Sequence, residues 1–135
     1  DNLQAAILSA KFKKYDEIVS KRRHLASLYI KYLSEVDEIS LPPMDDDGHF
    51  DVFQNFEIRA HKRDELIAYL SNNDVGTMKQ WGGFCLHHFK DLGLNSDVPY
   101  CEEMAKSFMM LPLNTTLSDD DVEFVSTKII DFYKL

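Results

Sequence analysis

The sequence predicts an α+β domain in which a small antiparallel or mixed sheet is covered by helices and preceded by one long helix. Three patterns carry this prediction. Residues 3–36 repeat apolar side chains every three to five positions, with no Gly or Pro among them. Residues 52–60 end in alternating apolar and charged side chains, which is typical of a half-buried strand. Ser118 is followed by three aspartates and an apolar stripe over residues 122–133, which together predict a terminal helix.

The predicted N-terminal helix is longer than the domain to which it belongs. At a rise of about 1.5 Å per residue it spans about 50 Å, whereas a compact domain of this length has a radius of gyration of about 14 Å. Its overhanging apolar stripe therefore needs another domain or subunit to cover Leu3, Ile7, Ala10 and Tyr15. The basic clusters of this helix are interpreted as a solvated face; they are Lys11/Lys13/Lys14 and Lys21/Arg22/Arg23.

The elements that follow are bounded by turn residues. Pro42 and Pro43 end the first helix, and residues 45–48 predict a turn. The expected order is then a strand over 52–60, a helix over 63–73, a strand over 75–81, a short helix over 87–92, a helix over 99–108, a strand over 109–111 and a final helix after Ser118. We expect one domain over residues 1–135, with a long interdomain helix over 1–36 and an α/β layer over 50–135.

Composition argues against several classes of function. The 135 residues carry a formal net charge of −8, which disfavours binding to nucleic acid. No apolar run approaches the roughly 18 residues of a membrane span, so no membrane association is expected. The two cysteines form no CxxC pair, which favours a reducing, cytoplasmic location. The chain begins without Met or a signal peptide, inside the predicted helix, so we expect a fragment of a longer protein.

The patterns for metal and thiol chemistry are weak. In residues 45–48 the Gly falls at the wrong place for a calcium loop, which favours a solvated turn. The histidines show no zinc-binding spacing. Cys85 lies two residues from His87, where the two side chains would not face each other on a helix, so no thiol nucleophile is predicted. Cys101 is expected in the core.

One polar loop that contains glycine is the candidate binding region. His87 and His88 follow Trp81-Gly82-Gly83 between two predicted elements, where binding residues often lie. The alternative is that one histidine packs and the other is solvated. The glycine pair would let a ligand approach the backbone closely, although no glycine-rich phosphate loop is present.

Five segments of the chain carry a family pattern in order. They are DNLQAAIL at residues 1–8, KRR with Leu28-Tyr29 from residue 21, DVFQNFEIR with RDEL over 51–66, VGT with QWGG and His87 over 75–87, and LPLN with LSDDDV over 111–122. Together they resemble the C-terminal part of DegT-type (DegT/DnrJ) nucleotide-sugar aminotransferases over nearly the whole chain. The first segment is similar to the start of the long interdomain helix of that family. The chain is therefore interpreted as a C-terminal small domain of such an enzyme.

The resemblance implies a fold-type I enzyme that uses pyridoxal phosphate, with its catalytic lysine and cofactor-binding residues upstream of Asp1. This fragment is then expected to be inactive, with no catalytic residue and no bound cofactor or metal. His87 corresponds to the histidine that lines the substrate end of the family's active site, and Gln80 and Trp81 occupy the adjacent loop. The implied partners are the chain's own N-terminal large domain, a second copy in a homodimer, a nucleotide sugar and an amino donor, expected to be glutamate.

Phe84-Cys85 replaces the proline-containing step that usually precedes the histidine in the family, so sugar contacts known from other branches are not carried over to this loop. A second interpretation is open, because a fold of this kind can be reused for another purpose. The alternative is a free-standing interaction or regulatory module.

Overall fold

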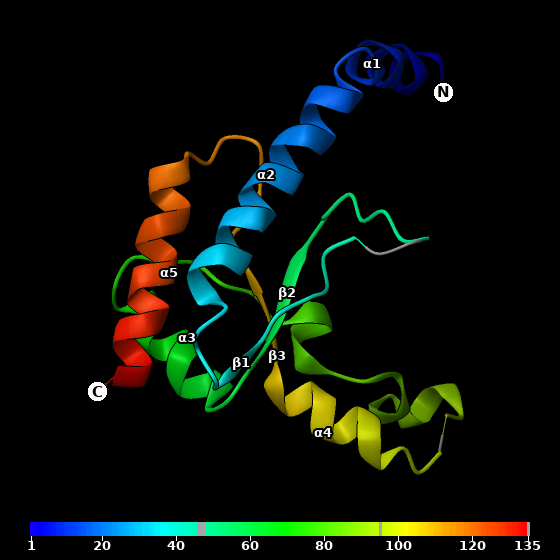
Figure 1. Ribbon diagram of the computed structural model, residues 1–135. Coiled ribbons are helices and arrows are strands. Elements are labelled where there is room, and N and C mark those ends of the chain that lie inside the picture. Colours follow the sequence, from blue (N-terminus) through cyan, green and yellow to red (C-terminus); the bar gives the residue numbers. More distant parts are fainter. Residues whose placement is uncertain (46–47, 95, 135) are drawn as a thin grey trace.

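The chain folds into a layer of helices packed on a small sheet, as the sequence predicts (Figure 1). The computed structural model describes residues 1–45, 48–94 and 96–134, so Asp46 and Asp47 of the predicted turn lie outside it. Over the described residues the elements are, in chain order, α1 (Asn2–Phe12), α2 (Tyr15–Leu33), β1 (Ile39–Ser40), β2 (Phe56–Ala60), α3 (Arg63–Ser71), the short 3-10 helices η1 (Gln80–Gly83), η2 (Leu86–His88) and η3 (Lys90–Leu92), α4 (Pro99–Ser107), β3 (Phe108–Leu111) and α5 (Asp119–Lys134). None of the described helices has both the length and the apolar character needed to cross a membrane.

β2 is the central strand of the antiparallel sheet that the described residues form, with β1 on one side and β3 on the other. The alternation predicted for β2 is confirmed. Phe56, Ile58 and Ala60 are buried in the core, whereas Glu57 and Arg59 are half-buried on the opposite face. β1 was not predicted, because a strand of two residues is too short to show a period in the sequence.

α2 and α5 pack side by side and cover the core face of the sheet (Figure 1). The ring of Tyr29 in α2 stacks on that of Phe56 in β2, with 5.0 Å between the ring centroids. The other buried side chains that these two helices contribute to the core are Leu25, Ala26, Leu33, Val122, Val125 and Ile129. Their burial stabilises the layer, since each large apolar side chain removed from water contributes about 1.5–3 kcal/mol.

The N-terminal helix predicted over residues 3–36 is in fact two helices, because the helical conformation is interrupted at Lys14. Lys14 leaves the helical conformation at φ −113° and ψ 14°. No residue of α1 is buried, so no tertiary contact imposes a continuous helix, and Lys11 and Lys14 place like charges three residues apart. The rings of Phe12 and Tyr15 stack across the break. α1 lies beyond the end of α2 and away from the sheet, so its apolar stripe is uncovered (Figure 1).

Arg22 and Arg23 do not lie on a freely solvated face, contrary to the prediction, because both are half-buried and bind the segment before β2. Arg22 Nη1 donates a hydrogen bond of 3.0 Å to the carbonyl oxygen of Phe53. Arg23 forms an ion pair with Asp45, and its guanidinium lies 4.0 Å from the ring centroid of Phe50. The hydrogen bond from Arg23 lowers the pKa of Asp45. These contacts fasten an irregular segment to α2.

The segment between α3 and α4 departs most from prediction. Residues 75–81 do not form a strand, since only Met78 pairs with the sheet, through an isolated bridge to Met110. The chain then turns away at residues 81–83, where three successive residues have positive φ. The helix predicted over 87–92 is a pair of 3-10 turns, η2 and η3.

The last three elements agree with prediction. α4 begins with a proline in its first turn, β3 includes residues 109–111, and α5 follows Ser118. Ser118 Oγ accepts a hydrogen bond of 3.2 Å from the amide of Asp121, and the Asp121 carboxylate accepts one of 2.8 Å from the amide of Ser118. This reciprocal capping satisfies two backbone N–H groups at the start of the helix. The hydrogen bonds from Ser118 also lower the pKa of Asp121.

Candidate functional site

The loop between α3 and α4 carries the three side chains predicted to bind substrate, Gln80, Trp81 and His87. Trp81, Gly82 and Gly83 have φ values of 51°, 68° and 84°, so the chain passes through three left-handed residues in succession. Glycines adopt such angles at little cost, whereas a positive φ is uncommon for a residue with a side chain such as Trp81. The turn leaves the Trp81 side chain 80% exposed.

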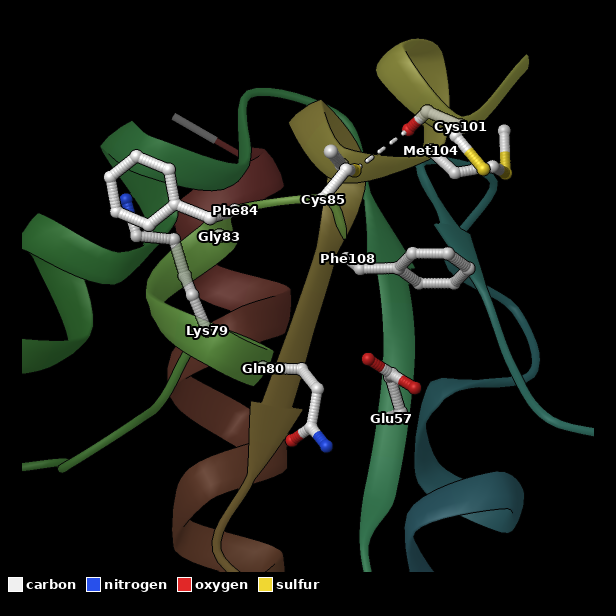
Figure 2. A pocket seen from close by; sticks show the side chains of 10 residues that line it. Glu57, Lys79, Gln80, Gly83, Phe84, Cys85, Cys101, Met104 and Phe108 are labelled. Carbon is white, nitrogen blue, oxygen red and sulfur yellow. Dashed lines mark hydrogen bonds between the residues drawn. The ribbon is translucent and has the colours of Figure 1, made fainter. Parts of the chain in front are cut away.

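A pocket of about 200 Å³ lies between this loop, β2 and α4 (Figure 2). Gln80 lines it, and Glu57 from β2 reaches it from the outer face of the sheet. The rest of the lining is mostly apolar, and includes Phe84, Cys85, Met104 and Phe108. This volume is below the roughly 300–1,000 Å³ of sites that enclose a whole organic ligand. The pocket therefore fits one group of a larger ligand.

Lys79 borders the same pocket, but its charge is already paired. Its Nζ lies 3.3 Å from Asp64 Oδ1, and the same oxygen lies 2.8 Å from Arg63 Nε. Partial desolvation of Asp64 would raise the pKa of its carboxyl. The hydrogen bond from Lys79 and the charge of Arg63 outweigh it, so this pKa lies below its usual value. The Lys79 side chain is 38% exposed, so it is hydrated and paired rather than desolvated for nucleophilic chemistry.

The two cysteines meet at the top of the pocket. Cys85 Sγ donates a hydrogen bond of 3.6 Å to the carbonyl oxygen of Cys101, drawn in Figure 2. Desolvation raises the pKa of the Cys85 thiol, which disfavours the reactive thiolate. Cys101 is exposed, so its predicted core position is wrong. Cys101 lies three residues before Met104, close to the same face of the helix, but Met104 is the residue of α4 that is buried.

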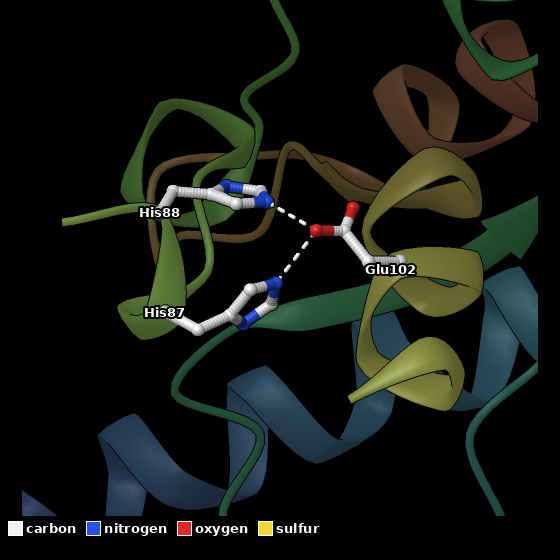
Figure 3. A group of neighbouring side chains, drawn as sticks. All are labelled: His87, His88 and Glu102. Atoms are coloured by element: carbon white, nitrogen blue, oxygen red, sulfur yellow. Dashed lines mark hydrogen bonds and ion pairs between the residues drawn. The ribbon is translucent and has the colours of Figure 1, made fainter. Parts of the chain in front are cut away.

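A second cluster joins η2 to α4. His87 Nε2 and His88 Nε2 each lie 2.6 Å from the same carboxylate oxygen, Glu102 Oε1, as Figure 3 shows. The two imidazole rings meet edge to face, with 4.4 Å between their centroids. The hydrogen bond from His87, followed by that from His88, lowers the pKa of Glu102. Glu102 is therefore a carboxylate whose Oε1 atom lies within hydrogen-bond distance of both rings.

The three side chains of this cluster are also a possible set of metal ligands, since their nitrogen and oxygen atoms lie within 4.8 Å of one another. The hydrogen-bond pattern argues against that use. His88 Nδ1 accepts a hydrogen bond of 3.1 Å from the backbone N–H of Cys85, so it carries no proton of its own. A neutral histidine that binds a metal through Nε2 must carry its proton on Nδ1, and here that proton would face another N–H group. The cluster is a hydrogen-bonded network.

The structure separates the predicted site residues into two places. Gln80 lines the pocket, and His87 belongs to the network with Glu102, whereas Trp81 extends outward. The partners of His87 were missed by sequence reasoning. Glu102 lies fifteen residues further along the chain, and a glutamate near the start of a helix gives no signal of a histidine contact.

The chain matches known proteins over nearly its whole length. A family model described as the DegT/DnrJ/EryC1/StrS aminotransferase family matches residues 1–130. The chain is 37% identical to a "Pleiotropic regulatory protein" from Geobacillus stearothermophilus, over 99% of this chain and 37% of that protein. It is 26% identical to a dTDP-4-dehydro-2,3,6-trideoxy-D-glucose 4-aminotransferase from Saccharopolyspora spinosa, over 93% of this chain and 33% of that protein.

Solved structures give the same result. The aminotransferase TlmJ from Streptoalloteichus hindustanus superposes with a TM-score of 0.80 at 30% identity, over 90% of this chain and 33% of that chain. DesV from S. venezuelae shares the fold with a TM-score of 0.89 at 24% identity, over 98% of this chain and 36% of that chain. The chain thus spans about a third of the length of the relatives that it matches. Because the family model covers nearly every residue, the chain belongs to the DegT/DnrJ/EryC1/StrS aminotransferase family.

Proposed function

We propose that the chain is the C-terminal small domain of a nucleotide-sugar aminotransferase that depends on pyridoxal phosphate. The longer enzyme would transfer an amino group from a donor, expected to be glutamate, to a keto nucleotide sugar in amino-sugar or polysaccharide biosynthesis. The observation that carries this proposal is the family match over residues 1–130, combined with coverage of about a third of each relative. The names of the relatives support the substrate class, since several are aminotransferases of dTDP sugars. A cytoplasmic location is proposed with it.

The cofactor is proposed for the longer protein, because the described residues here do not fit it. A lysine that holds pyridoxal phosphate needs a free amine, and Lys79, the lysine beside the pocket, is paired with Asp64. The pocket is also small and mostly apolar, and Lys79 is the cationic side chain among the described residues that line it. A structural neighbour at 14% identity, E. coli GDP-4-keto-6-deoxy-D-mannose-3-dehydratase, was solved with bound hydrated PLP, which is consistent with the cofactor proposed for the longer enzyme.

The isolated chain is therefore expected to form no specific covalent adduct with pyridoxal phosphate. The test is to mix the two, reduce with borohydride and measure the intact mass. A stoichiometric adduct on one lysine would contradict the proposal that the cofactor site lies outside this chain.

Within the longer enzyme, we propose that His87, Gln80 and Trp81 face the substrate. The loop that carries them exposes several large apolar side chains, of which Trp81, Leu86 and Leu92 are 80%, 72% and 66% exposed. Such a surface needs a cover, and the chain's own N-terminal large domain and a second subunit of a homodimer are the proposed covers. The cover would enclose the loop together with the substrate.

The proposed role of His87 is tested by His87→Ala in the full-length enzyme. The substitution should lower the rate of amine transfer to the sugar about 10-fold to 100-fold, with little change in loading from the amino donor. His61→Ala, at an exposed histidine remote from the loop, is the matched control. Equal loss in both half-reactions, or no loss in either, would remove His87 from the substrate end.

A second candidate function is supported by one relative. The 37% identical protein from Geobacillus stearothermophilus is named a "Pleiotropic regulatory protein", which favours a regulatory or interaction module. The discriminating measurement is cofactor content and amination of a keto nucleotide sugar by the full-length protein. An absence of both would favour the regulatory candidate.

A further inference from the structure

We propose that Glu102 and His88 are positioning residues for His87, and that together they hold its ring with Nε2–H on Glu102 and with Nδ1 presented to the substrate. The proposal rests on the proposed function in one respect, which is that His87 faces a substrate. It adds two residues, the protonated nitrogen and the kind of substrate group that His87 recognises.

The proton on His88 follows from its backbone contact. The N–H of Cys85 is a donor only, and it lies 3.1 Å from His88 Nδ1, so Nδ1 is the lone-pair nitrogen. The proton of the ring is then on Nε2, which lies 2.6 Å from Glu102 Oε1 and donates to it. His88 thereby connects the Glu102 carboxylate to the backbone of the loop, because one ring holds Cys85 on one side and Glu102 on the other.

The proton on His87 follows from the state of Glu102. Hydrogen bonds from both histidines lower the pKa of the Glu102 carboxyl, so this group is ionised near neutral pH and only accepts. His87 Nε2, 2.6 Å away, must be the donor. The ring of a neutral His87 therefore carries its lone pair on Nδ1.

His87 Nδ1 is the nitrogen of the network that can still accept a hydrogen bond. No partner for it exists within residues 1–45, 48–94 and 96–134, and Figure 3 shows the second ring nitrogen of His87 directed away from the carboxylate. The His87 side chain is 15% exposed, so a small part of it is open to a ligand. A neutral Nδ1 accepts from hydroxyl or N–H groups, and a sugar hydroxyl is a donor of this kind. The geometry thus assigns His87 to a substrate hydroxyl.

Nitrogen-15 NMR of the labelled 135-residue chain tests the positioning directly. Both His87 and His88 should show a protonated Nε2 and an unprotonated Nδ1. Glu102→Ala should turn His87 into a mixture of the two tautomers, whereas Glu102→Gln retains an acceptor oxygen and should preserve the Nε2–H form. Glu103→Ala removes a neighbouring exposed carboxylate of the same helix and should change nothing. A His87 protonated on Nδ1, or tautomers indifferent to Glu102→Ala, would overturn the proposal.

Kinetics of the full-length enzyme supply the second test. Glu102→Ala should slow amine transfer to the sugar about 10-fold to 100-fold, because His87 would lose the orientation in which it contacts the substrate. Glu102→Gln should recover most of the rate. Loading from the amino donor should be unchanged. If His87→Ala slows transfer and Glu102→Ala does not, the positioning role is wrong. If the NMR result holds and neither variant affects transfer, the proposed function of His87 fails while the network stands.

Discussion

The hydroxyl group of Tyr29, in α2, donates a hydrogen bond of 2.9 Å to the carbonyl oxygen of Pro112, the residue directly after β3. The Tyr29 side chain is fully buried, so this bond joins the helical layer to the sheet inside the core. Tyr29→Phe leaves the Pro112 carbonyl without this donor and should lower the free energy of unfolding by about 1 kcal/mol. Urea denaturation measures the change. Tyr32→Phe, at a half-buried position of the same helix, is the control and should stay within about 0.5 kcal/mol of the parent.

Tyr133 should make the chain less stable at alkaline pH. Burial raises the pKa of Tyr133 to about 12, and its hydroxyl donates to the carbonyl oxygen of His61 at 2.5 Å. In the unfolded chain the pKa is about 10, so the unfolded state loses this proton first as pH rises. The contribution is complete below about pH 10 and is lost between about pH 10 and 12. Urea midpoints over this range should fall less steeply in Tyr133→Phe than in Tyr15→Phe, which changes an exposed tyrosine.

Ser118→Ala should destabilise α5 at its N-terminus. The substitution removes the hydroxyl that accepts from the amide of Asp121, and the loss of such a cap costs about 1 kcal/mol. Thermal unfolding followed by circular dichroism measures the effect. Thr115→Ala, in the exposed segment before the helix, controls for the loss of a hydroxyl, and an equal effect of both variants would argue against the capping role.

Cys101 should react with iodoacetamide faster than Cys85 at neutral pH. Cys101 is exposed, whereas desolvation raises the pKa of the half-buried Cys85 thiol and its hydrogen is given to a carbonyl. Peptide mass mapping over a time course gives the two rates. Faster labelling of Cys85 would mean that its thiolate is favoured after all, and would reopen a nucleophilic role.

The isolated chain should associate through α1, and a symmetric dimer is the simplest form. Leu3, Ile7, Leu8 and Phe12 are all at least half exposed, and each large apolar side chain buried contributes roughly 1.5–3 kcal/mol. Sedimentation equilibrium at micromolar concentration should detect the dimer, and Ile7→Lys should shift it towards monomer. Gln4→Lys adds the same charge to the same helix at a polar position. An oligomer that resists Ile7→Lys would place the contact elsewhere.

The sequence predicted the parts of the fold whose pattern repeats. Phe56, Ile58 and Ala60 alternate with charged residues and form the central strand, and Ser118 with its aspartates begins α5. The interruption of the helix at Lys14 was not predictable from apolar spacing, because the period continues through it. The helix is interrupted there since α1 is not packed against the rest of the chain. Long periodic stretches therefore give the existence of a helix more reliably than its continuity.

The loop was harder to predict for two reasons. Residues 75–81 have the composition of a strand, but backbone angles at Trp81, Gly82 and Gly83 turn the chain away after a single bridge at Met78. The network of His87 depends on contact between η2 and α4, which no local pattern encodes. The family resemblance located His87 as a candidate, and only the structure supplied its partners.

The left-handed turn at Trp81 has an optical consequence. This residue is the sole tryptophan of the chain and is 80% exposed, whereas the stacked rings of Tyr29 and Phe56 are buried. The wavelength of its fluorescence emission therefore reports the surroundings of the loop and depends little on whether the core is folded. When a large domain, a second subunit or a sugar nucleotide covers the loop, the emission moves to shorter wavelength. The chain thus carries a built-in fluorophore at the place where its partners are proposed to bind.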